Sequence, residues 1–287
     1  MKVLIIQDNL HHKNKEGIEQ ILSFLKIEYK YGSLNDIKNY DIIFSPENPI
    51  DTSKYPNHKF IFGPHFSVFP NNKIKQINNI HNNSIYIQPS EWVRNLWSKY
   101  LIKYNIKTIT FPFPVNTEMF KPIKNYEKNK VFIYFKRRKP EELKFLQTFL
   151  KNNKIEYKIF DYVKRYRQKE YLKYLQESKY GIILDAHESQ GFAIEEALSC
   201  DVPLLVWNTK FMSQEYGGNY SNIPCTTIPY WDNRCGEFFY ESNDFEIKYN
   251  EFINKLDMYK PRQFILETLS NENCSINLIN LIKTIIF

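Results

Sequence analysis

The stretch from Asp185 to Trp207 decides the fold, and it reads DAHESQGFAIEEALSCDVPLLVW. An apolar run ends at Asp185, and a polar turn leads into a helical pattern from Gly191 to Cys200. The run from Leu204 to Trp207 is apolar throughout, as in a strand that is covered on both faces. Strand, helix and strand in this order predict a parallel sheet with covering helices.

The start of this helix is a candidate site for an anion. Gly191 allows the turn to approach a ligand closely, because glycine has no side chain. The first turn of a helix presents backbone N–H groups and a partial positive charge. Gln190, Gly191 and Phe192 therefore form a candidate diphosphate-binding segment.

Two acids flank this helix start. Glu188 lies in the turn and Glu196 follows eight residues later, which is at most about 12 Å along a helix axis. That separation suits two contacts to one extended ligand and is too long for a proton-sharing pair. The alternative is that these are ordinary acids on a solvated helix face, and we interpret the neighbouring Glu195 in that way.

The same alternation of strands and helices extends over the whole chain. The predicted strands cover residues 3–6, 41–44, 59–62, 84–88, 131–135, 154–160, 181–185 and 203–207. The predicted helices cover residues 16–25, 91–101, 140–150, 169–176, 191–200, 264–269 and 276–285. Ser90 stands where it can cap the second helix, and Pro140 suits the first turn of the third. The predicted fold class is α/β with doubly wound parallel sheets.

Prolines mark the middle of the chain. Pro112, Pro114 and Pro122 lie among polar residues, a composition typical of a connection. We therefore expect an N-terminal domain over residues 1–115, a linker over 116–129 and a C-terminal domain over 130–287.

Basic residues follow the first strand of the second half. Lys136, Arg137 and Arg138 come directly after the apolar run 131–135, at the carboxyl end of a strand, where open α/β sheets bind ligands. Arginine binds phosphate bidentately and lysine binds it as a point charge. The triplet is a candidate partner for a diphosphate, and the sequence does not distinguish which of the three side chains points inward.

Composition excludes several classes of protein. The 287 residues include 47 aromatic residues and only 8 glycines, which excludes a disordered or low-complexity chain. No apolar run approaches the roughly 18 residues of a membrane helix. The four cysteines have neither disulfide-framework nor zinc-ligand spacing, so we expect packing residues and a cytoplasmic location. A net charge of +7 attracts polyanions in general.

The run from Glu188 to Pro203 resembles the GT-B glycosyltransferases, and most closely the retaining family-4 type with its Glu-x7-Glu signature. The resemblance extends from about residue 40 to the end and implies two Rossmann-like domains that face each other across a cleft. It implies that residues 1–115 form the acceptor-side domain and residues 130–287 form the donor-binding domain. It leaves open whether the terminal helices pack back on the first domain.

The resemblance also implies roles for the candidate residues. Glu188 and Ser189 contact the donor sugar, Glu196 holds the ribose, and the basic triplet and the helix start bind the diphosphate. His65 follows Gly63 and Pro64 at the end of a predicted strand. In this family a histidine so placed lies near the donor sugar, so His65 and Glu188 are the catalytic candidates.

The end of the first strand departs from the family pattern. A glycine-rich loop is common there, but the first glycine of this chain is Gly17. Asp8, His11 and His12 are candidate contacts to the acceptor. The two histidines have no carboxylate at ligand spacing on one helix, so we expect no metal and no other cofactor.

The predicted activity is transfer of a sugar from a nucleoside-diphosphate sugar to a glycan, lipid-linked or protein acceptor, with retention of configuration. A nucleotide-sugar epimerase of the same fold and a non-catalytic nucleotide-sugar binding protein are the alternatives; release of free nucleotide distinguishes them. The stretch 164–167 is basic and aromatic, but no nucleic-acid-binding motif accompanies it, so we expect no nucleic-acid partner. Peripheral membrane contact and the oligomeric state stay open.

Overall fold

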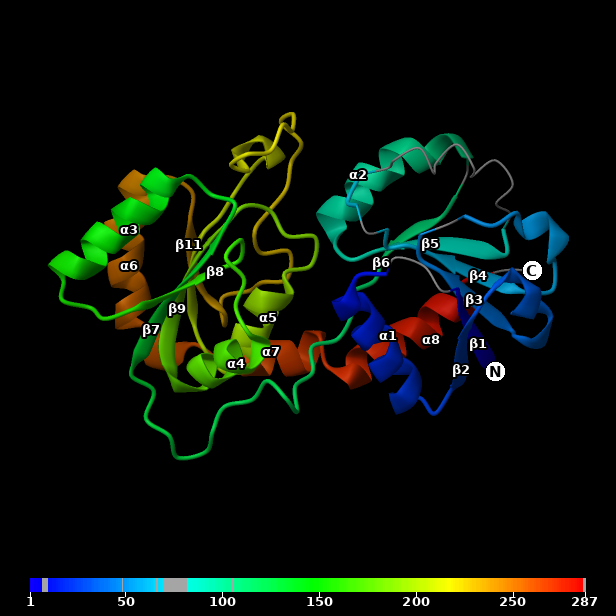
Figure 1. Ribbon diagram of the computed structural model, residues 1–287, viewed down its shortest axis with the longest axis horizontal. Helices are drawn as coiled ribbons and strands as arrows, with labels where there is room; N and C mark the ends of the chain where they lie inside the picture. The colour runs from blue at the N-terminus through cyan, green and yellow to red at the C-terminus, as the bar shows by residue number, and fades with distance from the viewer. Residues whose placement is uncertain (7–9, 48, 66, 70–81, 105, 286–287) are drawn as a thin grey trace. The chain divides into compact units, whose positions relative to one another are not determined.

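The computed structural model describes residues 1–6, 10–47, 49–65, 67–69, 82–104 and 106–285. The chain forms two compact units (Figure 1). Unit 1 comprises Met1–Pro114 and Leu269–Phe287, and unit 2 comprises Val115–Thr268. Each unit contains one parallel sheet, as the alternation of helices and strands predicts.

Unit 1 has a six-stranded sheet in the order β2-β1-β3-β4-β5-β6. Its strands are β1 (Lys2–Ile6), β2 (Glu28–Gly32), β3 (Ile42–Ser45), β4 (Lys59–Phe62), β5 (Ser84–Gln88) and β6 (Thr108–Thr110). Its helices are α1 (His12–Phe24), α2 (Glu91–Leu101) and α8 (Asn271–Lys283), with the 3-10 turns η1 (Leu34–Asn39), η2 (Thr52–Lys54) and η4 (Ile102–Tyr104).

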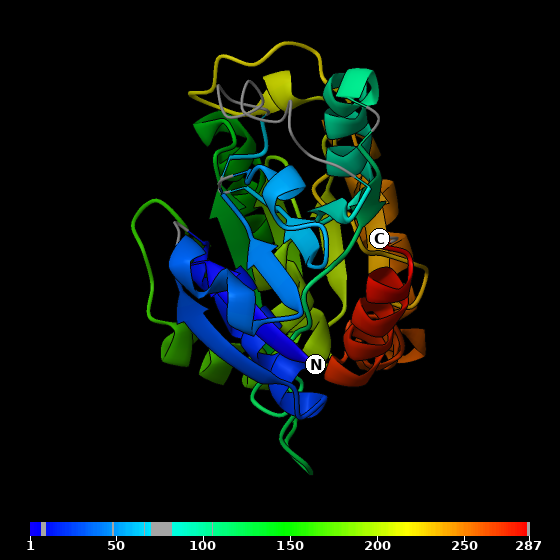
Figure 2. The ribbon, with the colours of Figure 1, turned by 90° about the vertical axis from the view of Figure 1, so that its right-hand side faces the viewer.

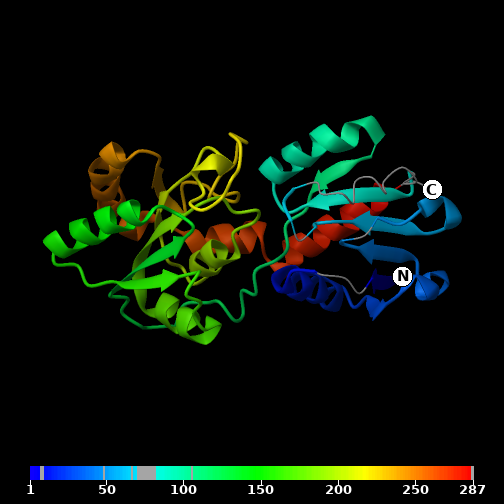
Figure 3. The same ribbon diagram turned by 45° about the horizontal axis from the view of Figure 1, so that its top comes forward.

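Successive residues of these strands point to opposite faces of the sheet, and helices cover both faces. Leu4 and Phe60 pack with Trp97 of α2 on one face. Val3 on the other face lies in a cluster with Ile18 of α1 and Leu281 of α8. Figures 1 and 3 show α1 and α8 side by side, and Figure 2 shows that α8, the last helix of the chain, lies beside the blue strands of unit 1.

Unit 2 has a five-stranded sheet in the order β11-β10-β9-β7-β8. Its strands are β7 (Lys130–Lys136), β8 (Lys158–Asp161), β9 (Ser178–Asp185), β10 (Leu204–Trp207) and β11 (Gly236–Phe239). Its helices are α3 (Pro140–Asn152), α4 (Gln168–Glu177), α5 (Phe192–Ser199), α6 (Phe245–Asn254) and α7 (Pro261–Thr268), with the 3-10 turns η5 (Met212–Gln214), η6 (Ser242–Asp244) and η7 (Leu256–Met258).

Helices cover both faces of this sheet as well. Ile133 and Ile182 pack with Leu146 of α3 and Phe252 of α6 on one face. On the opposite face Phe132 packs edge-on against Tyr171 of α4. Figure 1 shows α3 and α6 together on one side of the sheet and α4 and α5 on the other.

The structure refines the expected domain borders. Residues 116–129, expected as a linker, are part of unit 2, where the buried Phe120 accepts hydrogen bonds at its carbonyl from Ser199 and Arg262. The terminal helix α8 is part of unit 1. Ser90 occupies the N-cap position of α2 as expected, but its hydroxyl makes no capping hydrogen bond.

Candidate functional site

The candidate site lies at the carboxyl ends of β7 and β9. From β7 the chain passes through α3 to β8 on one side and then through α4 to β9 on the other. Since α3 and α4 cover opposite faces of the sheet, the two strand ends form a topological switch point, the usual ligand position in an open α/β sheet. Lys136 and Asp185, the last residues of the two strands, lie side by side in register.

Lys136 is the cation at this switch point. Its ammonium forms an ion pair with the carboxylate of Glu188 and lies 4.0 Å from Oδ2 of Asp185. The ammonium also stands 4.7 Å from the ring centroid of Tyr162, in cation–π contact. Burial disfavours the charge of Lys136, but the two acids outweigh burial and raise its pKa. Lys136 is therefore a fixed positive charge at any physiological pH.

Asp185 and Glu188 both lie close to the ammonium of Lys136, but their pKa values shift in opposite directions. Burial and the nearby Glu188 raise the pKa of Asp185 well above its ordinary range, despite the opposing effect of Lys136. Glu188 is also buried, but Lys136 and its other neighbours lower its pKa overall. Glu188 is therefore the carboxylate that forms the ion pair with Lys136, and burial opposes ionisation of Asp185.

Sequence reasoning placed Glu188 and Lys136 in the site but missed Asp185. The signal that selected Lys136 also applies to Asp185, because both are charged residues that end an apolar strand at the same edge of one sheet. Asp185 is completely buried, and its Oδ1 accepts a hydrogen bond of 2.6 Å from the backbone N–H of Ala186.

The start of α5 lies next to this cluster. Gly191 is the N-cap of α5 and has φ +96°, a left-handed conformation that favours glycine. The backbone N–H of Glu188 donates a hydrogen bond of 3.1 Å to the carbonyl of Thr226, which fixes the turn before the helix. The amide-rich end of an eight-residue helix and an ammonium group thus lie close to Glu188.

The two acids inside α5 are buried, which excludes a solvated helix face. Glu196 is 5 % exposed and Glu195 is 1 % exposed. The interpretation of Glu195 as an ordinary surface acid is therefore wrong. Its Oε2 accepts a hydrogen bond of 3.0 Å from Gln190, and burial raises its pKa well above the ordinary range. Gln190, a candidate for the diphosphate, is itself 2 % exposed and makes this internal contact.

The three basic residues after β7 have three different environments. Arg137 is half exposed and donates a hydrogen bond of 3.0 Å to Glu215. Glu215 also lies 3.4 Å from Nδ1 of His187, and burial lowers the pKa of His187 to about 4. His187 is therefore neutral at physiological pH, and sequence reasoning had not selected it or Glu215.

Arg138 points into the domain. It is 1 % exposed, its Nε and one terminal nitrogen bind the carboxylate of Glu142, and the other terminal nitrogen donates to the carbonyls of Asp185 and Trp207. Through the bonds to Asp185 and Trp207, the Arg138 guanidinium holds the carboxyl ends of β9 and β10 together. The sequence left open which of the three basic side chains is available to a diphosphate; Arg138 is committed to these internal bonds, so Lys136 and Arg137 stay candidates.

The candidates from the first half of the sequence belong to unit 1. His65 is buried; its ring stacks on Trp97 at 4.8 Å and its Nε2 lies 2.6 Å from the hydroxyl of Tyr86. Its Nδ1 is 3.8 Å from Glu47. His11 and His12 contact each other at the start of α1, with ring centroids 4.5 Å apart. Asp8 lies outside the described residues.

The described residues contain neither a metal-binding cluster nor a membrane-spanning helix. No group of three or more His, Cys, Asp or Glu side chains in the described part of the chain is arranged to hold a metal ion. In the same residues, no helix has the length and apolar character that crossing a membrane requires.

Comparison with known proteins identifies the fold. No family model and no curated protein matches the chain, whereas solved structures do. TarM is similar with a TM-score of 0.54 and 17 % identity, over 84 % of this chain and 54 % of TarM. The catalytic domain of starch synthase IV from Arabidopsis thaliana, bound to ADP and acarbose, is similar with a TM-score of 0.52 and 8 % identity. The match covers 86 % of this chain and 73 % of that domain.

A third structure, the N-terminal domain of Candida albicans trehalose-6-phosphate phosphatase, is similar with a TM-score of 0.56 and 12 % identity. The match covers 98 % of this chain and 78 % of that domain. The chain spans about half the length of TarM and of an accessory secretory protein structure from Streptococcus pneumoniae that it also matches. The chain therefore has the α/β fold of the GT-B proteins, with two Rossmann-like domains.

Proposed function

We propose that the protein is a GT-B glycosyltransferase that uses a nucleoside-diphosphate sugar as donor. The observation that carries the proposal is the group of Lys136, Glu188 and the start of α5 at the switch point of unit 2. The cation and the helix N-terminus suit the diphosphate of such a donor, and the carboxylate of Glu188 suits the hydroxyl groups of its sugar. The solved starch synthase IV domain of similar fold, which is bound to ADP and acarbose, supports this choice.

Lys136, Arg137 and the start of α5 at Gly191 and Phe192 are the proposed diphosphate site. Glu188 balances the charge of Lys136, and Glu215 balances the charge of Arg137. An incoming diphosphate competes for both cations, and the helix dipole adds a third favourable interaction.

Glu188 and Ser189 are the proposed contacts to the donor sugar, and Glu196 is the proposed contact to the ribose. A carboxylate accepts hydrogen bonds from vicinal hydroxyls, and the lowered pKa of Glu188 keeps it ionised for this purpose. Release of Glu188 from Lys136 when the diphosphate binds would free the same carboxylate for the sugar.

The proposed reaction retains the anomeric configuration without a metal ion. The bond from the anomeric carbon to the diphosphate breaks while the acceptor oxygen bonds to the same face, and the leaving diphosphate takes the acceptor proton. Lys136 and Arg137 stabilise the charge that develops on the diphosphate. No step is assigned to His65, because its ring and Nε2 are engaged inside unit 1.

The test is binding of ADP, UDP and GDP to the full chain, measured by thermal shift and calorimetry. We expect one of them to raise the melting temperature. Lys136→Met and Arg137→Ala should each weaken binding by about tenfold or more, as for loss of a charged hydrogen bond. Lys144→Met, at an exposed position of α3, is the matched control and should bind normally.

Catalysis is tested separately, by incubating the chain with the sugar derivative of the nucleotide that binds and with a mixture of saccharide acceptors. Release of free nucleotide together with a glycosylated product supports transfer. Indifference to all three nucleoside diphosphates would refute the donor site, and conversion of the donor to an epimer would replace transfer by epimerisation.

A further inference from the structure

A projecting segment of unit 2 reaches the proposed diphosphate site. Residues 211–224, which we call the arm, lie in the connection between β10 and β11. Phe211 and Pro224 form an antiparallel bridge at its base, where the backbone N–H of Met212 donates a hydrogen bond of 2.9 Å to the carbonyl of Ile223. Figure 1 shows the arm in yellow, projecting from the rest of unit 2. The base of the arm is therefore fixed by its own hydrogen bonds.

The middle of the arm is held by Arg137. Oε1 of Glu215 accepts a hydrogen bond of 3.0 Å from the Arg137 guanidinium, and the backbone N–H of Tyr216 donates one of 2.8 Å to the Arg137 carbonyl. Oε2 of Glu215 lies 3.4 Å from Nδ1 of His187. Burial lowers the pKa of His187 to about 4, so Arg137 is the charged one of these two partners at physiological pH.

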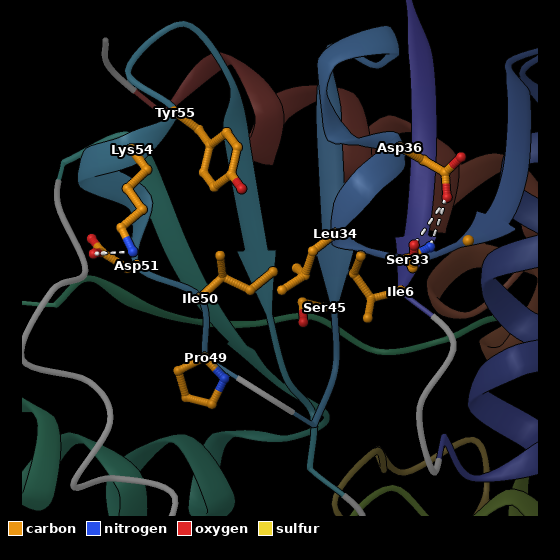
Figure 4. A pocket seen from close by; sticks show the side chains of 11 residues that line it. Ile6, Ser33, Leu34, Asp36, Ser45, Pro49, Ile50, Asp51, Lys54 and Tyr55 are labelled. Atoms are coloured by element: carbon orange, nitrogen blue, oxygen red, sulfur yellow. Dashed lines mark hydrogen bonds and ion pairs between the residues drawn. The ribbon is translucent and has the colours of Figure 1, made fainter.

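The ion pair of Arg137 and Glu215 differs from a local pair on the protein surface. Figure 4 shows a local pair beside a pocket of unit 1, where the ammonium of Lys54 lies 3.7 Å from Asp51, three residues earlier. The Lys54 side chain is 71 % exposed, and pairs of this kind contribute little to stability. Arg137 and Glu215 are 78 residues apart, and the Glu215 side chain is 6 % exposed. Their contact therefore ties the arm to the end of β7.

The tip of the arm, residues 215–220, has little other packing. Tyr216 and residues 217–219 are exposed, and no atom lies within 4 Å of a Cβ added at Gly217. Tyr220 adds an edge-on ring contact to His187, with centroids 5.7 Å apart. Glu215 is the buried residue of the tip. Loss of its ion pair with Arg137 should therefore loosen the tip.

We propose that the contact between Arg137 and Glu215 is autoinhibitory: Glu215 competes with a diphosphate for Arg137, and a diphosphate that binds displaces Glu215 and releases the tip of the arm. This inference rests on the diphosphate site proposed above. The Arg137 side chain is 48 % exposed, so a ligand can reach it beside Glu215. A diphosphate carries more charge than a carboxylate and offers more oxygen atoms to the guanidinium. By linkage, the contact weakens ligand binding by the same factor by which the ligand weakens the contact.

Affinity is measured on the full chain by calorimetry with ADP, UDP, GDP and inorganic pyrophosphate. Glu215→Gln keeps the shape of the side chain and removes the competing charge. We expect it to bind the ligand about two- to fivefold more tightly, the effect of one partly exposed ion pair. Damage to the fold would weaken binding, so a gain separates inhibition from a structural role. Glu251→Gln makes the same change in the ion pair of Glu251 with Lys248 on α6 and should bind normally.

A double variant separates competition for Arg137 from general repulsion between Glu215 and the ligand. Arg137→Ala leaves no guanidinium for which the two can compete. Adding Glu215→Gln to Arg137→Ala should therefore change the affinity by less than about twofold. Equal gains with and without Arg137 would overturn the proposal.

Release of the arm is measured by hydrogen exchange followed by mass spectrometry. Peptides from residues 211–224 should exchange faster when the ligand binds, and also in ligand-free Glu215→Gln. Glu251→Gln should exchange at the rate of the unsubstituted protein. A bound ligand ordinarily slows exchange at its site, so slower or unchanged exchange of the arm would contradict its release.

The inference and the proposed function fail separately. Nucleoside diphosphate binding that is equal or weaker in Glu215→Gln overturns the inference and leaves the donor site intact. Tighter binding of pyrophosphate to Glu215→Gln, in a protein that binds no nucleoside diphosphate, supports the autoinhibitory contact and contradicts the proposed function. If neither pyrophosphate nor any nucleoside diphosphate binds, both are overturned.

Discussion

Arg137 and Arg138 are adjacent in the sequence, yet the Arg137 side chain is 48 % exposed and that of Arg138 is 1 % exposed. Arg137 has φ +50°, so the backbone turns between the strand and the helix. This turn sends the Arg138 side chain to Glu142 and the carbonyls of two strands, while Arg137 reaches Glu215. Of two identical side chains, Arg138 is thus committed to internal contacts, and Arg137 is half exposed.

Substitution separates these two roles. Arg138→Met leaves Glu142 and the carbonyls of Asp185 and Trp207 without their buried donor, so we expect a loss of about 3–5 kcal/mol in the free energy of unfolding. Arg137→Met, at a half-exposed position, should lose less than about 1 kcal/mol. Urea unfolding measures both, and equal destabilisation would contradict the assignment.

The buried carboxyl group of Glu195 should make the free energy of unfolding depend on pH. Its pKa is raised by burial from the ordinary 4.5, so above pH 4.5 the folded state retains a proton that the unfolded state releases. Proton uptake on folding makes stability fall as pH rises, with a slope of at most about 1.4 kcal/mol per pH unit. Glu195→Gln removes this titration, so its stability relative to the unsubstituted protein should increase from pH 5 to pH 8.

Urea unfolding of both proteins at several pH values measures this difference. Glu141→Gln makes the same chemical change at an exposed position of α3 and serves as the control. Parallel stability curves for Glu195→Gln and the unsubstituted protein would show that Glu195 is ionised in the folded state.

At the scale of elements, the start of α5 depends on Gly191. Alanine at φ +96° is strained by about 1–2 kcal/mol, and relief of the strain would shift the turn that carries Glu188. Gly217 has φ +79°, and no atom lies within 4 Å of an added Cβ. Gly217→Ala therefore strains the backbone but causes no steric clash. We expect both variants to lose similar stability in urea unfolding and only Gly191→Ala to bind nucleoside diphosphate more weakly.

The central strands could be predicted from the sequence because they are buried on both faces. β3, β4, β5, β7, β9 and β10 are nearly continuous apolar runs, and the pattern found each of them within a few residues. The missed strands β2, β6 and β11 all lie at sheet edges. β2 reads EYKYG and β6 reads TIT, and neither has a fully buried residue, so no apolar run marks them.

The candidate site was partly predictable for a related reason. Lys136 and Glu188 follow recognisable elements, and the parallel sheet brings the ends of β7 and β9 together. Burial of Glu195 was not predictable, because it depends on how α4 and α7 pack around α5. Tyr171 of α4, for example, donates its hydroxyl hydrogen bond to the carbonyl of Ala193 in α5.

At the scale of the whole molecule, the chain leaves unit 1 at Pro114 and returns to it at Leu269. The last helix therefore completes a core that the first strands begin. Leu281 of α8 is 4 % exposed and lies in one apolar cluster with Val3, Phe44 and Ile61 of the unit 1 sheet. Helix α8 is a structural part of unit 1 rather than an appendage of unit 2.

Because α8 packs on the unit 1 sheet, a substitution near the end of the chain should destabilise strands near its beginning. Leu281→Asp places a carboxylate in the apolar cluster, which should destabilise unit 1 by several kcal/mol. Hydrogen exchange followed by mass spectrometry should show faster exchange in peptides from β1, β3 and β4, whereas peptides from β7 and β9 keep their protection. Ile276→Asp, at a position 51 % exposed on the same helix, is the control and should leave both sheets unchanged. Faster exchange in β7 and β9 alone would mean that α8 supports unit 2, contrary to the division of the chain described here.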